Sequence, residues 1–243
     1  MKVKDKEEKG NGITSWSYSR YTVYKQCPRK AKFTMIDKLK EPKNPAMERG
    51  IKVHTDIEHY IKGTMRELTP EAFLLKREIK ALKELHNVAP NKVHVEDSWA
   101  FRKDWSLTRF NDWAGCWLRV KLDAGHYEGE HGTTYIVTDW KTGKFYPNDV
   151  EAYCQQLEIY ALGAFIQMPW IDTVRCRLAY VDSGTFYPDE HGTVFKRKHL
   201  DSLKALWLKR VAPMFTDRDF APRPNAKCKW CFFSHQNGGT CEF

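Results

Sequence analysis

An acid and an amine stand two residues apart at the end of an apolar stretch, Asp139 and Lys141 in the segment YIVTDWKTGK (135–144). In an extended strand, side chains at i and i+2 point to the same face, so the two groups emerge together. Thr142 and Gly143 then end the strand. The plainer interpretation is a solvated ion pair at a strand end, and the chemical one is an acid and a base that share a site. These two residues alone do not decide between them.

Two further residues extend the chemical interpretation. Asp123 ends the preceding predicted strand, and with Asp139 it can hold a hard divalent cation such as Mg²⁺ or Mn²⁺. Such a cation lowers the pKa of bound water and stabilises charge on a phosphoryl group. Lys141 beside it would orient or deprotonate the attacking water, or stabilise the pentavalent transition state. His54 lies on the apolar stripe of a predicted helix and would complete the metal site.

Substrate contacts are expected from the helix that follows the Asp139 strand. Gln156 and Tyr160 are four residues apart, so both reach the same side of this helix and can position a substrate phosphate. Acid, acid, base, imidazole and phosphate contacts together are typical of a metal-dependent phosphodiesterase.

Periodicity predicts the elements that position these residues. Helices are expected from residue 14 and at 46–61, 70–86, 148–165 and 200–214, with strands from 93, at 113–123, before 142, at 173–181 and at 193–195. A polar loop at 124–132 would join two of the strands into an antiparallel hairpin. The distance between Asp123 and Asp139 stays open.

Two of the predicted helices have an apolar face that we expect to point inward. In the helix at 46–61 this face is Met47, Ile51, His54, Ile57 or Glu58, and Ile61. In the helix at 70–86 it is Phe73, Leu74, Ile79, Leu82 and Leu85.

Composition narrows the class of protein. A chain of 243 residues with 42% hydrophobic residues can bury a core, as one large domain or two small ones. No apolar run approaches the roughly 20 residues of a membrane span, and the charged N-terminus carries no secretory signal, so we expect a cytoplasmic protein without a membrane partner. A net charge of +9 suits a polyanion such as DNA.

The motifs and their order resemble the RecB-like exonuclease branch of the PD-(D/E)XK nuclease superfamily. The matching pieces, in chain order, are CPRK (27–30), ERGIKVH (48–54), KLD (121–123), DWKTGK (139–144) and QLEIY (156–160). Two departures are Leu122, where the superfamily name expects proline, and Asp139, where glutamate is common.

The resemblance implies an α/β fold, with a central mixed sheet flanked by helices as in restriction endonucleases. It implies that His54, Asp123, Asp139 and the backbone carbonyl of Trp140 hold the metal and that Lys141 is the catalytic lysine. It also implies a nuclease domain at 13–220 (a helical part at 13–90 and the catalytic core at 91–220) and a cysteine-rich segment at 221–243 that packs with Cys27. The charged, glycine-containing residues 1–12 before this domain are expected to be a flexible tail.

The cysteines suggest a second metal site. Cys228 and Cys231 form a CxxC, and Cys241 follows near the C-terminus. With His235 or Cys27 as fourth ligand, this set can bind Zn²⁺. Iron–sulfur clusters also take four thiolates, and CRISPR-associated exonucleases of the resembled branch join an early cysteine to three late ones around a [4Fe–4S] cluster. Zinc, a cluster and no metal all remain open, while Cys116, Cys154 and Cys176 are expected in the core.

The main functional hypothesis is a metal-dependent DNA exonuclease that acts on DNA ends in recombination, repair or phage DNA processing. A single-strand annealing protein or another recombination protein would be its partner. The alternatives are a non-catalytic DNA-binding or recombination-assembly module that keeps the nuclease fold, and a structural protein that binds zinc or a cluster.

Overall fold

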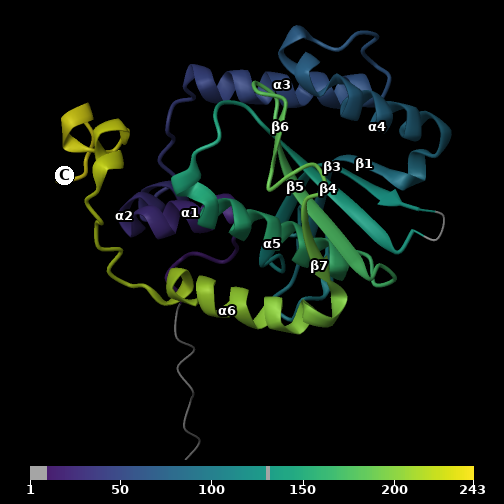
Figure 1. The fold of residues 1–243 in the computed structure, drawn as a ribbon. Helices are drawn as coiled ribbons and strands as arrows, with labels where there is room; N and C mark the ends of the chain where they lie inside the picture. The colour runs from purple at the N-terminus through teal and green to yellow at the C-terminus, as the bar shows by residue number, and fades with distance from the viewer. Residues whose placement is uncertain (1–9, 130–131) are drawn as a thin grey trace, which may run out of the picture. The chain divides into compact units, whose positions relative to one another are not determined.

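The computed structural model describes residues 10–129 and 132–243, so residues 1–9 of the predicted tail at 1–12 lie outside the described part. In the described residues one seven-stranded sheet has the order β2–β1–β3–β4–β5–β6, with β7 also pairing β5 (Figure 1). β4 and β5 are parallel and the other pairs are antiparallel. The mixed sheet confirms the predicted α/β class. The strands are β1 Val93–Phe101, β2 Leu107–Thr108, β3 Leu118–Glu128, β4 Thr134–Lys141, β5 Thr173–Tyr180, β6 Thr185–Tyr187 and β7 Thr193–Lys196.

The α-helices of the described residues are α1 Tyr18–Gln26, α2 Pro28–Ala31, α3 Pro45–Ile61, α4 Lys76–Val88, α5 Val150–Gln167 and α6 Leu200–Thr216. α5 connects β4 to β5, because parallel neighbours need a crossover connection. Lys43–Lys204 forms one compact unit, and the described residues before and after it form the other. None of the helices in the described part is long and apolar enough to cross a bilayer.

Helices cover both faces of the sheet in the unit Lys43–Lys204 (Figure 1). Side chains of α3 and α4 share a buried cluster with Val95, Ala124 and Trp140 of the sheet. On the opposite face, α5 approaches so closely that a Cβ at Gly163 would lie 3.0 Å from the ring of Trp99 and 3.4 Å from Val120. Glycine therefore allows the contact between α5 and the sheet.

The predicted inward stripe of α3 is wrong in its first half. Met47 and Ile51 are each 51% exposed, whereas Val53, Ile57 and Ile61 are fully buried. The buried stripe thus begins only in the third turn of the helix. His54, next to Val53, lies partly buried at the edge of this stripe.

The third predicted helix is two elements, and this changes its buried side. Pro70–Leu75 is a 3₁₀ helix that leads into α4. With three residues per turn, Ala72 and Leu75 fall on one face, and both are buried. The predicted inward residues Phe73 and Leu74 are 52% and 63% exposed, whereas Ile79 and Leu82 are buried as predicted.

β3 starts later and runs further than predicted. The expected strand was 113–123 with a loop at 124–132, but β3 is Leu118–Glu128, and residues 130–131 of the expected loop lie outside the described part. The segment from Ala124 lacks apolar alternation, yet it pairs with β1 on one side and with β4 on the other. The predicted antiparallel hairpin is confirmed, and Asp123 lies in the middle of its first strand.

The second unit contains the start and the end of the chain. Ser17 caps α1, accepting a hydrogen bond from the backbone N–H of Arg20. α1 ends at Gln26 and Pro28 restarts the chain as α2, so Cys27 is an extended residue between two helices. Asn225 donates to the carbonyl of Gln26 at 3.4 Å, which brings the C-terminal segment beside Cys27.

Candidate active site

Asp123 and Asp139 occupy adjacent positions on neighbouring strands. The β3–β4 ladder runs to the pair Ala124 and Thr138, and the next step along both strands is Asp123 and Asp139. Here the backbone N–H of Trp140 donates to Oδ2 of Asp123 at 2.8 Å. The Asp123 side chain therefore lies between the strands, and the register sets the proximity that the sequence left open.

Asp139 is held by its neighbours on β4 and α5. The Tyr160 hydroxyl donates to Oδ1 of Asp139 in a short hydrogen bond, and the Gln156 amide donates to the same oxygen at 3.2 Å and to the Tyr160 oxygen at 3.1 Å. Lys141 Nζ lies 2.6 Å from Oδ2 of Asp139, so the i,i+2 pair is in contact. Gln156 and Tyr160 thus contact an acid in the structure, and their contact with substrate phosphate stays a prediction.

Burial controls the ionisation of this cluster. Burial, followed by the charges of Asp139 and Asp123, raises the pKa of Tyr160 well above its usual value, so its hydroxyl stays a donor. Burial and the charge of Asp139 likewise raise the pKa of Asp123, against the opposing hydrogen bonds from His54 and the Trp140 N–H. Two buried carboxylates side by side repel each other, which a shared cation would relieve.

His54 reaches the site from α3. Its Nδ1 lies 3.3 Å from Oδ1 of Asp123 and 3.9 Å from Oε1 of Glu96. Burial by itself would lower the pKa of His54, but the hydrogen bond and charge of Asp123, with the charges of Asp139 and Glu96, outweigh it and raise this pKa. The imidazole thus lies against an acid of the sheet, and its role as a metal ligand stays a prediction.

Glu96 is the residue that sequence reasoning missed. The β1–β3 ladder pairs Val95 with Ala124 and continues beyond the position where Glu96 faces Asp123. Glu96, Asp123 and Asp139 therefore form a line across β1, β3 and β4, called the acidic row below. In a regular strand Glu96 would share a face with His94, so no sequence signal placed it near His54.

The ligand atoms of His54, Glu96 and Asp123 all lie within 4.8 Å of one another, and no other such group of His, Cys, Asp or Glu occurs in the described residues. Asp139 lies outside this group. The predicted metal ligands are thus distributed over two adjoining clusters, with Asp123 next to both.

The turn after Lys141 is fixed by an ion pair. Arg49 of α3 donates two hydrogen bonds to Asp182, at 2.9 and 2.5 Å, and Asp182 accepts a third from the backbone N–H of Gly143 at 2.6 Å. Gly143 has φ of +96°, which a side chain rarely adopts. β4 ends at Lys141, as the Thr142–Gly143 pair predicted.

The family follows from comparison with known proteins. The sequence pattern of the PD-(D/E)XK nuclease superfamily matches residues 15–236. The chain belongs to this superfamily. PD-(D/E)XK nucleases use divalent metals, and the residue types here fit one: two buried carboxylates, an imidazole and a lysine. Oδ2 of Asp139 is also buried. The ammonium of Lys141 pairs with it as an ion at 2.6 Å, but no described residue donates a hydrogen bond to it.

Solved structures similar to this nuclease share little sequence with it. A protein from Eubacterium rectale, whose name proposes an exonuclease, has a TM-score of 0.48 at 10% identity, covering 98% of this chain and 94% of that one. The protein SSO0001 has a TM-score of 0.39 at 16% identity, covering 90% and 84%. Both TM-scores are below 0.5 and support no argument about activity. No curated protein matches the chain.

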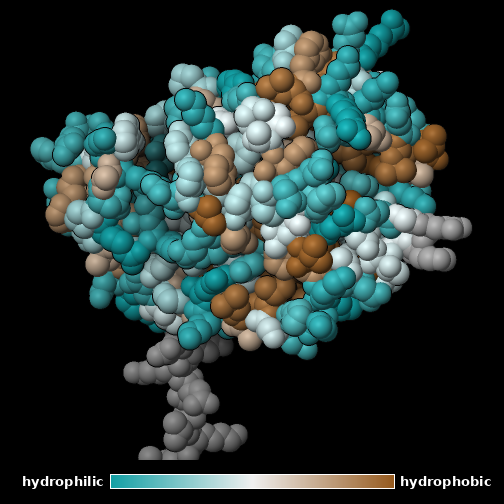
Figure 2. Space-filling view, in the orientation of Figure 1, coloured by the Kyte–Doolittle hydropathy of each residue, from teal (hydrophilic) through white to brown (hydrophobic). Residues whose placement is uncertain are grey.

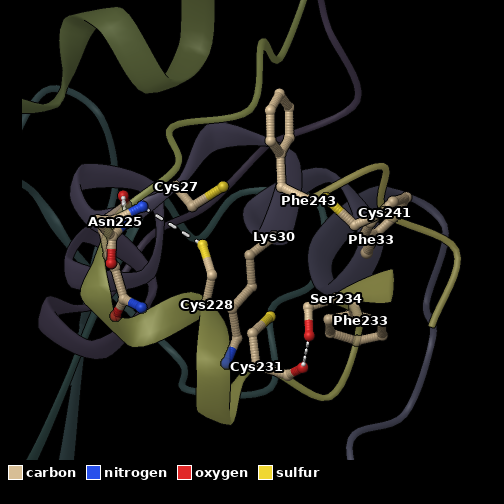
Figure 3. Close-up of a pocket in the computed structure, with 11 residues that line it drawn as sticks. Cys27, Lys30, Phe33, Asn225, Cys228, Cys231, Phe233, Ser234, Cys241 and Phe243 are labelled. Carbon is tan, nitrogen blue, oxygen red and sulfur yellow. Dashed lines mark hydrogen bonds between the residues drawn. The ribbon is translucent and has the colours of Figure 1, made fainter. Parts of the chain in front are cut away.

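The nuclease also has a pocket lined by cysteines, in the unit that contains both chain ends (Figure 3). Cys27, Cys228, Cys231 and Cys241 line it, each partly buried and with a free thiol. The backbone N–H of Asn225 donates to Sγ of Cys228 at 3.4 Å. The tertiary structure thus brings together the four predicted ligands, which we call the cysteine pocket.

The other three cysteines differ in burial. Cys116 and Cys176 are buried as predicted. Cys154 is exposed, so its predicted place in the core is wrong. Its Sγ lies 3.3 Å from the hydroxyl of Tyr187 on β6.

Proposed function

We propose that this protein is a Mg²⁺- or Mn²⁺-dependent DNA exonuclease of the RecB-like branch. The observation that carries the proposal is the pairing register, which makes Asp123 and Asp139 neighbours while Lys141 contacts Asp139. An acid pair with an adjoining lysine is what phosphodiester hydrolysis by a bound metal needs. Gln156 and Tyr160 resemble the branch motif, and both bond Asp139.

In this proposal Asp123, Asp139, His54 and the Trp140 carbonyl hold the cation. When bound, the cation lowers the pKa of a water and stabilises negative charge on the phosphoryl group. Lys141 orients or deprotonates the attacking water, or stabilises the charge that develops as it attacks. Tyr160 and Gln156 keep Asp139 in one orientation, as second-layer hydrogen bonds do in metal sites.

The positive net charge of the chain supports DNA as the substrate. A net charge of +9 favours association with a phosphate backbone. We propose that the enzyme works on DNA ends in the cytoplasm, in recombination, repair or phage DNA processing, beside a single-strand annealing or another recombination protein.

A cleavage assay tests the proposal. End-labelled linear DNA, single- and double-stranded, and covalently closed circular DNA are incubated with Mg²⁺, with Mn²⁺ or with EDTA. We expect nucleotides to be released from linear DNA in either metal and closed circles to remain intact. Asp139→Asn should abolish the release. Asp201→Asn, at a side chain that is 98% exposed, is the matched control.

The alternatives give different outcomes in the same assay. Cleavage of closed circles would contradict the exonuclease and indicate an endonuclease. Salt-sensitive DNA binding without cleavage in either metal would indicate a non-catalytic DNA-binding module.

For the cysteine pocket we propose a [4Fe–4S] cluster. A tetrahedral Zn²⁺ with bonds of about 2.3 Å holds its sulfurs about 3.8 Å apart. No three cysteine sulfurs in the described residues lie within 4.8 Å of one another, and a cluster of four irons holds its thiolates further apart than one ion does. Iron and sulfide analysis with the visible spectrum of anaerobically purified protein tests this, and stoichiometric zinc would overturn it.

A further inference from the structure

We propose that Glu96 is an additional ligand of the divalent cation, which it binds together with His54 and Asp123, and that Lys121 neutralises Glu96 until the cation arrives. This inference rests on the proposed function, because it assigns a further residue to the same metal-dependent site. It adds a side chain from β1, a strand that contributes none of the predicted site residues.

The backbone turns Glu96 away from its regular direction. In a regular strand, residues five apart point to opposite faces, yet His94 and Trp99 both contact Tyr135. His94 Nδ1 lies 2.6 Å from the Tyr135 hydroxyl, and the ring centroids of Trp99 and Tyr135 are 6.4 Å apart. The alternation is therefore inverted between His94 and Trp99. Glu96 lies in this interval and has φ of +53°.

The inversion brings the Glu96 carboxylate toward α3. Regular alternation would place it on the face of His94, but Oε1 of Glu96 lies 3.9 Å from His54. A non-glycine residue in the left-handed region costs about 1 kcal/mol or more. A glycine or asparagine would hold this backbone more easily, so the carboxylate itself is the feature that a ligand would use.

The spacing suits a small divalent cation. Mg²⁺ prefers octahedral ligands at about 2.1 Å, so ligand atoms on opposite sides of the ion are about 4.2 Å apart. His54 Nδ1 lies 3.3 Å from Asp123 and 3.9 Å from Glu96, within this limit. The widest separation in the group is no more than 4.8 Å, so a side-chain shift of about half an ångström completes the fit.

Lys121 can leave Glu96 when a cation binds. Its Nζ lies 2.6 Å from Oε2 of Glu96, while its side chain is 63% exposed and that of Glu96 only 13%. The amine can therefore move into solvent and the carboxylate stays in place. An open pocket lined by Gly50, His54, Glu58, Glu96 and Lys121 gives an ion access from solvent.

Calorimetric titration of the full, DNA-free chain with Mn²⁺ tests the proposal. Glu96→Gln should weaken Mn²⁺ binding at least about tenfold. Lys121→Met should strengthen it severalfold, because the competing ammonium is gone; a purely structural ion pair predicts no such gain. Glu58→Gln is the control, since Glu58 lines the same pocket but pairs with Lys62 at 2.7 Å, and its affinity should match the wild type.

The folded state is checked independently. Glu96→Gly should weaken Mn²⁺ binding as much as Glu96→Gln, yet unfold without metal at the wild-type temperature or above, because glycine accepts φ of +53°. Unchanged affinity in both Glu96 variants would overturn the inference and leave the proposed function intact. A wild-type chain that binds no Mn²⁺ would instead overturn the proposed function.

Discussion

The acidic row and the cysteine pocket each gather residues from distant parts of the chain, but they are built differently. Every acid of the row already has a strong partner in the fold: Asp123 accepts from a sheet N–H, Asp139 from Tyr160, and Glu96 from Lys121. The cysteine pocket instead lies among short elements, the 3₁₀ helices Ala226–Trp230 and His235–Asn237.

The difference concerns what a metal contributes in each place. The sheet holds the acidic row through backbone ladders, so a cation there adds chemistry and changes the fold little. Two short 3₁₀ turns supply little cooperative stability of their own. A group bound by four thiolates would therefore contribute folding free energy to the chain ends.

The largest expected effect tests the acidic row. Lys141→Ala should lower the initial rate of nucleotide release by about a thousandfold or more, equivalent to about 4 kcal/mol of activation free energy, while the unfolding temperature changes little. Lys144→Ala is the matched control, because Lys144 is exposed in the same turn. A Lys141 variant with wild-type rates would remove this residue from the mechanism.

The next effect tests the cysteine pocket and should fall on stability. Cys231→Ser should eliminate the visible absorbance of a bound cluster and lower the unfolding temperature by roughly 5–10 °C. Cys154→Ser, at an exposed thiol outside the pocket, should change neither quantity. If both variants melt like the wild type, the pocket holds nothing that stabilises the chain ends.

A smaller effect separates orientation from chemistry within the row. Tyr160→Phe removes the hydroxyl that donates to Asp139 but keeps the ring. We expect the rate to fall about 10–100-fold, with Mn²⁺ affinity reduced as well and the absorbance of the cysteine pocket unchanged. A rate within twofold of wild type would show that Gln156 alone positions Asp139.

The smallest effect concerns the sheet without any metal. Burial, with the charges of Arg177 and Arg175, lowers the pKa of His126 to about 4. Since an unfolded histidine titrates near 6.5, the unfolded chain binds more protons between these values. The stability that the neutral His126 contributes to the folded state is therefore fully present above pH 6.5 and is lost as the pH falls toward 4. Partial solvent screening limits the loss to roughly 1–2 kcal/mol.

Urea unfolding at several pH values in this window measures the slope. His126→Gln, which cannot gain the proton, should flatten it. An equal slope in both proteins would assign the acid sensitivity to other groups.

Local patterns predicted much of the fold. The apolar run before Asp139 predicted a strand that ends at Lys141, and the helical spacing of Gln156 and Tyr160 predicted that both reach one side of α5. Both signals depend on neighbours within a few residues, so they survive whatever the chain packs against. The family motifs have the same local character.

The predictions that are wrong share one physical origin. The buried stripe of α3 was misplaced because burial depends on which turns meet the sheet. The 3₁₀ geometry of Pro70–Leu75 moved Phe73 and Leu74 to the surface. The predicted strand ends too early, at Asp123, because Gly125 and His126 look like loop residues. A Cβ at Gly125 would in fact lie 2.1 Å from the Tyr135 hydroxyl, so glycine is required there within the sheet.

By itself, the sequence determined which groups are available for catalysis, namely an acid and a lysine on one strand, a second acid on the strand before, and a histidine on a helix. Only the tertiary structure decided that Asp123 lies beside Asp139 and that Glu96 joins His54. Both depend on strand register and on one left-handed residue. Register is set by hydrogen bonds between strands and by packing on both faces of the sheet, and no spacing along a single strand encodes it.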